Sequence, residues 1–223
     1  MRHDGGVTAT VHLADADTLA DLVTYLGRAR RADPDGAARL VAHGDVLAAY
    51  VSPVHGGGGP VVLGLRTGRL RAPADLDVTV PLAAAVERLA GGVALPGAAL
   101  DLPDARMSTT ASWAGMSPPR QGWQLVGPVD GVALAGRASS GIAEVADGAP
   151  AGSGAAAVAA LRARVWGRPL SDAEPDLPVG VAYAAMVLGF LEAGGPATVF
   201  RSGPWWRVTT SAGHVLARRP ALL

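Results

Sequence analysis

The chain has 223 residues, and its 19 basic residues, all of them arginine, balance 19 acidic residues. This zero net charge excludes the uniformly basic surface of a protein that coats nucleic acid or an anionic membrane. The absence of cysteine excludes disulfides, thiolate metal sites and cysteine nucleophiles.

The start of the chain contains acidic residues and no apolar run, which predicts that it carries no signal peptide. The longest apolar run, 177–191, has 15 residues and falls short of the roughly 20 that a membrane-spanning helix needs. We therefore expect a cytoplasmic protein.

Residues 1–90 show the periodicities of one α+β domain. Alternating apolar residues predict a strand over 7–13, and a 3-4-7 apolar spacing predicts a helix that is capped by Asp17 and ended by Pro34. Two short runs, 38–42 and 46–51, are predicted to form a hairpin around Gly44-Asp45. Further elements complete an N-terminal mixed sheet with flanking helices: strands over 60–66 and 76–80 and a helix over 82–90.

Residues 91–120 lose this periodicity and are rich in proline and alanine, which indicates an irregular connection between two domains. The run SWAGMSPPRQGW over 112–123 gathers aromatic, apolar and basic side chains. A connection that only spanned two domains would be polar. We therefore predict that this segment contributes to a binding surface, through Trp113, Met116, Arg120 and Trp123.

Residues 121–223 are predicted to form a mostly helical part that ends in a small antiparallel β-sheet. The first expected helix, 129–147, places Val132, Ile142 and Val145 along one face, and a second one begins after a cap at Ser153. A third helix over 178–192 is apolar on every side, which predicts that it is buried. Strands are expected over 197–201, 205–210 and 214–218.

Three helices followed by strands have the element order of a winged helix. The predicted fold class of the whole chain is α+β, with one α+β domain over 1–90 and a helical plus β-hairpin domain over 121–223. The two parts either separate cleanly or share one core.

The sequence lacks the common signatures of enzymes and metal sites. It has no G-x-S-x-G nucleophile turn and no H-E-x-x-H pair, and its five histidines lack metal-ligand spacing. The glycine run 56–59 precedes a proline and a strand, which indicates a flexible loop between strands and not a phosphate cradle. We predict no catalytic residue, no metal ligand and no cofactor.

Trp205, Trp206 and Arg207 alternate across a predicted strand, so the two indoles face opposite sides of the sheet. An exposed indole beside an arginine would stack on a base, a ring or a partner's side chain, and all three residues join the candidate binding surface. The favoured alternative has both indoles packed, one against the buried helix and one under 112–123, because tryptophan is highly buried on average.

These patterns favour a non-catalytic binding or protein-interaction module that binds a protein partner or self-associates as a homodimer. The first alternative is a nucleic-acid-associated protein, because 155–223 holds 7 arginines against 4 acidic residues, with Arg207, Arg218 and Arg219 near the predicted wing. It is weaker because the helix in the recognition position, VGVAYAAMVLGFLEA, has no polar face to read a groove. The second alternative is an enzyme with an unrecognised site.

Three segments, SPPRQGWQLVG, GIAEVADGAPAGSGAAAVAALRARVWGRPL and the tail GPWWRVTTSAGHVLARR, resemble a group of uncharacterised proteins from high-GC Gram-positive bacteria. The resemblance covers most of the chain. It implies a bacterial, cytoplasmic domain protein, and it brings no function and no catalytic or binding residue with it.

Overall fold

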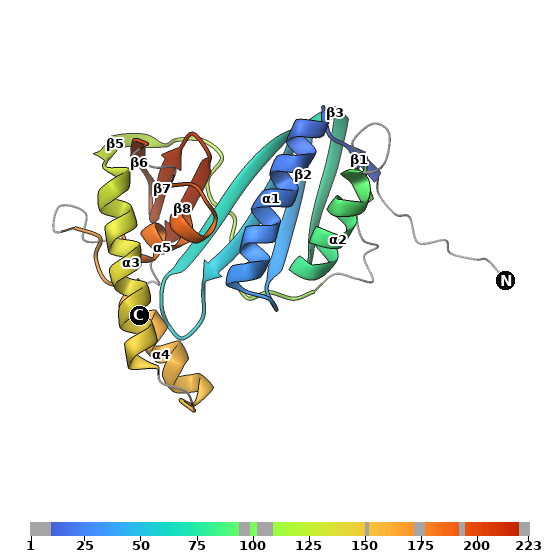
Figure 1. Ribbon diagram of the computed structural model, residues 1–223. Helices are drawn as coiled ribbons and strands as arrows, with labels where there is room; N and C mark the ends of the chain where they lie inside the picture. Colours follow the sequence, from blue (N-terminus) through green and yellow to red (C-terminus); the bar gives the residue numbers. More distant parts are fainter. Residues whose placement is uncertain are drawn as a thin grey trace. The chain divides into compact units, whose positions relative to one another are not determined.

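The computed structural model describes residues 10–93, 99–101, 109–149, 152–171, 177–191 and 195–218. The chain divides into two compact units: the first comprises Met1–Val51 and Arg66–Ala114, and the second Ser52–Leu65 and Gly115–Leu223. Each unit combines helices and strands (Figure 1), so the chain is α+β. None of the described helices combines the length and the hydropathy that crossing a bilayer requires.

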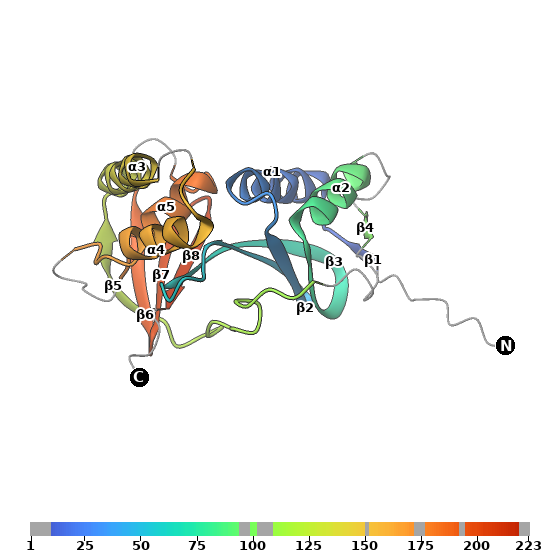
Figure 2. The same cartoon turned by 90° about the horizontal axis from the view of Figure 1, so that it is seen from below.

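The first unit places two helices together on one side of two long strands (Figure 2). Its elements are, in chain order, β1 (Thr10–His12), α1 (Ala16–Ala32), β2 (Ala37–Val54), β3 (Val61–Pro81), α2 (Leu82–Val93) and β4 (Ala99–Asp101). β1 and β4 pair antiparallel as a separate two-stranded sheet. The part of the predicted first strand over 7–9 lies outside the described residues.

Helix α1 forms where the apolar spacing predicts it. Leu19, Leu22 and Leu26 are buried, as the 3-4-7 pattern requires. The predicted cap at Asp17 is wrong, because Oδ1 of Asp15 accepts the hydrogen bond from the backbone N–H of Thr18 at 2.7 Å. A cap satisfies a backbone donor that the first helical turn leaves unpaired, and here the helix starts two residues earlier than predicted.

Strand β2 continues through the position of the predicted hairpin, so the expected turn at Gly44-Asp45 is wrong. Gly44 has a φ of +59° and is exposed, and the strand runs on through it to Val54. β2 is an edge strand, and an edge tolerates a local irregularity because one side of its backbone has no partner strand. The strands expected over 60–66 and 76–80 are likewise one strand, β3.

The second unit is built around a sheet with the strand order β2-β3-β8-β7-β6-β5. Its own elements are β5 (Gln124–Val129), α3 (Gly131–Gly148), α4 (Ala155–Trp166), α5 (Gly180–Val187), β6 (Ala197–Ser202), β7 (Trp205–Thr210) and β8 (Gly213–Arg218). The hairpin Ser52–Leu65 belongs to this unit, and Val61–Leu65 of β3 pairs antiparallel with His214–Arg218 of β8.

The mostly helical, winged-helix-like arrangement predicted for the second half is wrong, because this half is built on a six-stranded sheet. The three C-terminal strands form where the sequence predicts them, but they lie inside a six-stranded sheet, with β3 beside β8 and β5 beside β6. The helix in the recognition position, α5, is buried from Gly180 to Ala185, as its apolar sequence predicts. A wing needs a free hairpin and a recognition helix needs an exposed face, and neither is present in this part of the described chain.

Helix α3 forms over nearly the predicted range, but its buried stripe is offset by one residue, about 100° around the helix, from the predicted stripe. The buried residues are Gly131, Leu134, Ala138 and Gly141, whereas Val132 and Ile142 are exposed. The small residues face inward because the indole ring of Trp166 on α4 comes very close to the backbone of α3 at Gly141. That ring also stacks on Tyr183 of α5, with 4.4 Å between the ring centroids. A larger side chain on that face of α3 would not fit.

The four-glycine run connects β2 to β3, as predicted, and it packs against α4. Gly57 has a φ of +62°, and a Cβ placed on it would lie 3.2 Å from the carbonyl oxygen of Ala159. A Cβ on Gly59 would lie 3.0 Å from Cβ of Ala163. Glycine is therefore required here for backbone conformation and for the close approach of the loop to the helix. The predicted cap of α4 at Ser153 is wrong, since the helix begins after Gly154 without a side-chain cap.

Candidate functional site

Two of the predicted site residues, Trp123 and Arg207, meet on the sheet face that the helices leave uncovered. Cζ of Arg207 lies 4.6 Å from the ring centroid of Trp123 and 4.5 Å from that of Phe200, its cross-strand partner. The indole N–H of Trp123 donates to the carbonyl oxygen of Pro119 at 3.0 Å. In Figure 2 the segment before β5 runs along the side of the strands away from α3 and α5, and these contacts hold it there.

The environment of Arg207 is partly desolvated. Its Nε is buried and has no hydrogen-bond partner among the described residues. Burial lowers the pKa of Arg207, because the charged form loses hydration. The two ring faces attract the guanidinium and offset part of that cost. Arg207 therefore contacts residues of its own unit and helps to pack the segment that carries Trp123.

Trp205 and Trp206 are both buried, so neither is the exposed indole beside an arginine that a stacking site would need. The alternation of β7 explains how. Val208 lies on the same face of β7 as Trp206, and it is buried together with its cross-strand partners Val199 and Val215. Trp205 shares the other face with Arg207.

The remaining predicted site residues are spread out. Trp113 is buried in the first unit, whereas Met116 and Arg120 belong to the second, the former half-buried and the latter exposed. The structure thus brings Trp123 and Arg207 into contact and does not place Trp113 in the same unit.

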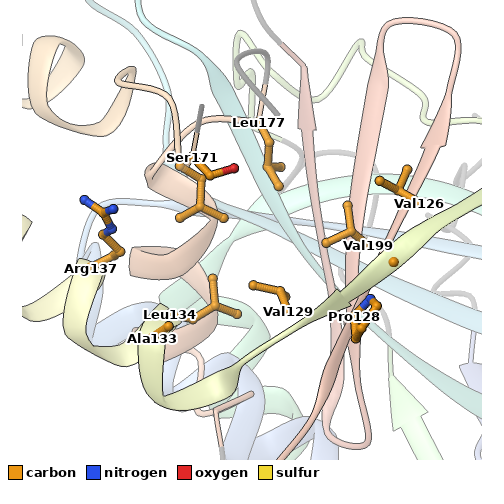
Figure 3. A pocket seen from close by; sticks show the side chains of 11 residues that line it. Val126, Pro128, Val129, Ala133, Leu134, Arg137, Ser171, Leu177 and Val199 are labelled. Atoms are coloured by element: carbon orange, nitrogen blue, oxygen red, sulfur yellow. The ribbon is translucent and has the colours of Figure 1, made fainter. Parts of the chain in front are cut away.

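A pocket that the sequence reasoning missed lies between the start of α3 and the sheet edge (Figure 3). It has a cavity volume of about 220 Å³. Its described lining is mostly apolar and consists of Val126, Gly127, Pro128, Val129, Ala133, Leu134, Arg137, Leu170, Ser171, Leu177 and Val199. All of these residues belong to the second unit.

Local features of β5 and α3 position the pocket. β5 is the last strand of the sheet, and its pairing with β6 shifts register between Leu125 and Gly127. Asp130 then ends the strand and caps α3, because its Oδ1 accepts a hydrogen bond from the N–H of Val132 at 2.9 Å. This tight strand-to-helix turn brings Leu134 of α3 opposite Val129 at the end of β5 (Figure 3).

Most of the exposed large apolar side chains lie on the two elements that flank the pocket. Among the described residues, the exposed large hydrophobic side chains are Val46 (41%), Leu125 (68%), Val126 (43%), Val132 (63%) and Ile142 (40%). All except Val46 are on β5 or α3. Val126 lines the pocket, and Leu125 and Val132 each adjoin a lining residue in the chain. Exposed apolar surface on two such neighbouring elements is a mark of interaction sites.

The chemistry of the pocket is simple. Arg137 is the one charged side chain in the described lining, and it stands on the α3 side of the opening (Figure 3). Arg137 is exposed, and Ser171 supplies a hydroxyl. Among the described residues, no group of three or more histidine and acidic side chains is placed to hold a metal ion. The lining offers apolar contact and one positive charge.

Sequence reasoning missed this site because it assigned Val132 and Ile142 to one apolar stripe and left β5 unassigned. A signal was present in α3. Its other face holds glycine and alanine, and a helix that buries such small residues must pack very closely against its neighbour.

Comparison with protein families matches two segments of the chain. Residues 7–115 match a model described as a domain of unknown function, DUF8010, and residues 118–222 match another described as a domain of unknown function, DUF8185. The division falls close to the boundary at Ala114, but the hairpin Ser52–Leu65 of the first segment belongs to the second unit. Among curated proteins, none matches the chain.

Several solved structures are similar to the chain at low identity. The DNA polymerase sliding clamp of Caulobacter crescentus is 13% identical, with 96% of this chain and 65% of the clamp covered and a TM-score of 0.47. The DNA polymerase III subunit beta of Pseudomonas aeruginosa is 11% identical, with coverages of 96% and 64% and a TM-score of 0.44. The DnaN sliding clamp of Bartonella birtlesii bound to griselimycin is 10% identical, with coverages of 96% and 66% and a TM-score of 0.43. The chain thus spans slightly less than two thirds of the length of these proteins.

Proposed function

We propose that this chain is a non-catalytic protein-binding module whose second unit binds a short segment of a partner protein at the pocket between β5 and α3. The observation that carries the proposal is an apolar pocket lined by the exposed Val126, with the exposed Leu125 and Val132 on the same two elements, β5 and α3. Leaving such side chains in water costs roughly 25 cal/mol for each Å² of apolar surface, which a partner that covers them recovers.

The size of the pocket favours side chains over a cofactor or a drug-sized ligand. Small-molecule sites span about 300–1,000 Å³. The cavity here, at about 220 Å³, is smaller. It holds one or two large side chains of a peptide, and the exposed residues on its rim cover the neighbouring part of the same peptide.

The edge strand itself supports insertion of side chains and not addition of a strand. Pro128 lacks a backbone N–H to donate, and the register of β5 shifts between Leu125 and Gly127. Proline and irregular pairing are the devices by which natural sheets prevent another strand from adding to an edge. A partner therefore binds through its side chains, in the pocket.

The test compares two matched substitutions of exposed valine. Val126→Asp places a charge at the pocket, and Val46→Asp places the same charge on the first unit at nearly equal exposure. Tagged wild-type chain and both variants are used to capture proteins from a lysate of the source organism, with unfolding curves to show that all three are folded. We expect a protein that wild type and Val46→Asp retain and that Val126→Asp loses at least tenfold. Capture that is equal for all three chains contradicts the proposal.

The cytoplasmic location, the homodimer and the kinship with high-GC Gram-positive proteins stay predictions from the sequence. Solution mass measured over a range of concentrations tests the homodimer. If the chain self-associates and Val126→Asp abolishes this, the occupant of the pocket is a second copy and not a partner protein.

A further inference from the structure

We infer that the partner segment carries a carboxylate close to the large apolar side chain that enters the pocket, and that Arg137 pairs with it. This inference rests on the proposed function and adds the chemistry of the ligand. Its basis is the charge of the lining: Arg137 is basic, and the other described lining residues are uncharged.

The position of Arg137 suits recognition of a group just outside the cavity. Arg137 lies four residues after Ala133 and three after Leu134, about one turn of α3, so it shares the side of the helix that borders the pocket. Leu134 is buried and Arg137 is exposed. Arg137 belongs to the lining and is exposed, with its guanidinium pointing away from Leu134 and Val129 (Figure 3), as expected of an arginine that packs its aliphatic stem and keeps its charge in water.

No described acidic residue forms an ion pair with Arg137. Glu144, two turns further along α3, already has a partner, since Arg168 from the segment after α4 donates to both of its carboxylate oxygens at 2.5 and 2.6 Å. Arginine presents N–H donors in a fixed planar fork that matches a carboxylate, and a ligand carboxylate is the group that this fork binds best in a protein segment.

Geometry limits where the acidic residue can lie. An extended peptide advances about 3.3 Å per residue. A carboxylate that reaches the rim while its neighbour occupies the cavity is therefore within about two residues of the apolar anchor. The ligand class is a short peptide with a large aliphatic or aromatic residue next to, or one residue away from, aspartate or glutamate.

The experiment selects ligands without assuming a partner. Random heptapeptides displayed on phage are selected on the immobilised full chain, on Arg137→Glu and on Arg164→Glu, which reverses an exposed charge at the end of α4. Wild type and Arg164→Glu are expected to enrich an apolar residue with aspartate or glutamate within two positions. Arg137→Glu is expected to enrich the same apolar residue with lysine or arginine instead.

The outcomes separate the inference from the proposed function. The proposed function is wrong if Val126→Asp still binds every peptide that wild type enriches, or if wild type enriches none. The inference alone is overturned if Val126→Asp abolishes the apolar enrichment but the selected peptides show no acidic preference or carry basic residues instead. It is also overturned if Arg137→Glu leaves the acidic preference unchanged. For the most enriched acidic peptide, measured by fluorescence polarisation, we expect Arg137→Gln to weaken binding about two- to fivefold, the range for an exposed ion pair.

Discussion

Gly141 of α3 packs directly against the indole ring of Trp166 of α4. A Cβ placed on Gly141 would overlap Cζ3 of the ring and lie 2.8 Å from Cη2. The ring has no room to retreat, because its other neighbour is Tyr183, stacked at an interplanar angle of 22°. This contact brings α3 and α4 together, and it determines which face of α3 is left exposed at Val132.

We predict that Gly141→Ala destabilises the second unit by about 1–2 kcal/mol. Overpacking a filled core costs about 1–3 kcal/mol, and the helical preference for alanine over glycine returns about 0.5–1 kcal/mol. The matched control is Gly136→Ala in the same helix, where no atom lies within 4 Å of the added Cβ. Denaturant unfolding should show opposite signs for the two variants, and equal stabilisation by both would contradict the packing described.

The loop between β2 and β3 gives a second matched pair. Gly57 and Gly58 have φ values of +62° and +74°, so alanine at either position pays about 1 kcal/mol or more for a left-handed backbone. A Cβ on Gly57 also presses on Ala159, whereas one on Gly58 meets no atom within 4 Å. Gly57→Ala should therefore lower the free energy of unfolding more than Gly58→Ala. Equal effects in thermal or denaturant unfolding would mean that the loop does not pack on α4.

The contact between Arg207 and Trp123 should be measurable as a coupling energy. In a double-mutant cycle with Arg207→Met and Trp123→Leu, we expect about 0.5–2 kcal/mol, because the arginine is partly desolvated against the ring. The comparison pair is Arg201 and Trp206, whose 5.1 Å contact involves an exposed arginine and should couple less. A coupling near zero for the first pair would remove its role in holding the segment before β5.

Acid should weaken the link between α3 and α4 through Glu144. The hydrogen bond from Arg168 lowers the pKa of Glu144 below its ordinary value of 4.5. A carboxyl group whose pKa is lower in the folded state stabilises the fold above its unfolded pKa, and this contribution is lost as the pH falls through the folded pKa. Glu144→Gln should be less stable than wild type at pH 7, and the difference should shrink as the pH falls below the ordinary pKa of 4.5 and disappear once it is below the lowered pKa of the folded state.

The control for that experiment is Asp147→Asn, which removes an exposed negative charge from the same helix without an ion pair to a described residue. Its unfolding curve should differ little from that of wild type at either pH. A difference between wild type and Glu144→Gln that persists unchanged in acid would show that the ion pair with Arg168 is not its cause.

The segment 118–222 should not fold alone, although it matches a family model by itself. Val61–Leu65 pairs with β8, and Val62 and Leu63 are fully buried, so the isolated segment leaves a long edge of its sheet without a partner. We expect that the segment 118–222 aggregates or loses cooperative unfolding when it is expressed alone. When residues 52–65 are present as well, we expect a folded protein. Cooperative unfolding of the isolated segment would contradict this.

The sequence by itself determined the elements whose periodicity is local. The alternation around Val208 predicts β7, and the spacing of Leu19, Leu22 and Leu26 predicts α1, because each pattern follows from the repeat of its own backbone. It also predicted that α5 is buried, since that helix has no polar face to turn toward water. The packing of Trp205 and Trp206 followed from the average burial of tryptophan.

Only the tertiary structure decided which surfaces stay exposed to solvent. α3 carries two faces that could be buried, and the larger apolar one is exposed because Trp166 fits against Gly141 and not against Ile142. In the same way, β2 runs through Gly44 as one strand at the edge of its sheet, where the irregular backbone of Gly44 is tolerated. These outcomes depend on which distant segment arrives as a neighbour, and the period of a single segment does not contain that information. The candidate site between β5 and α3 is a product of such long-range choices.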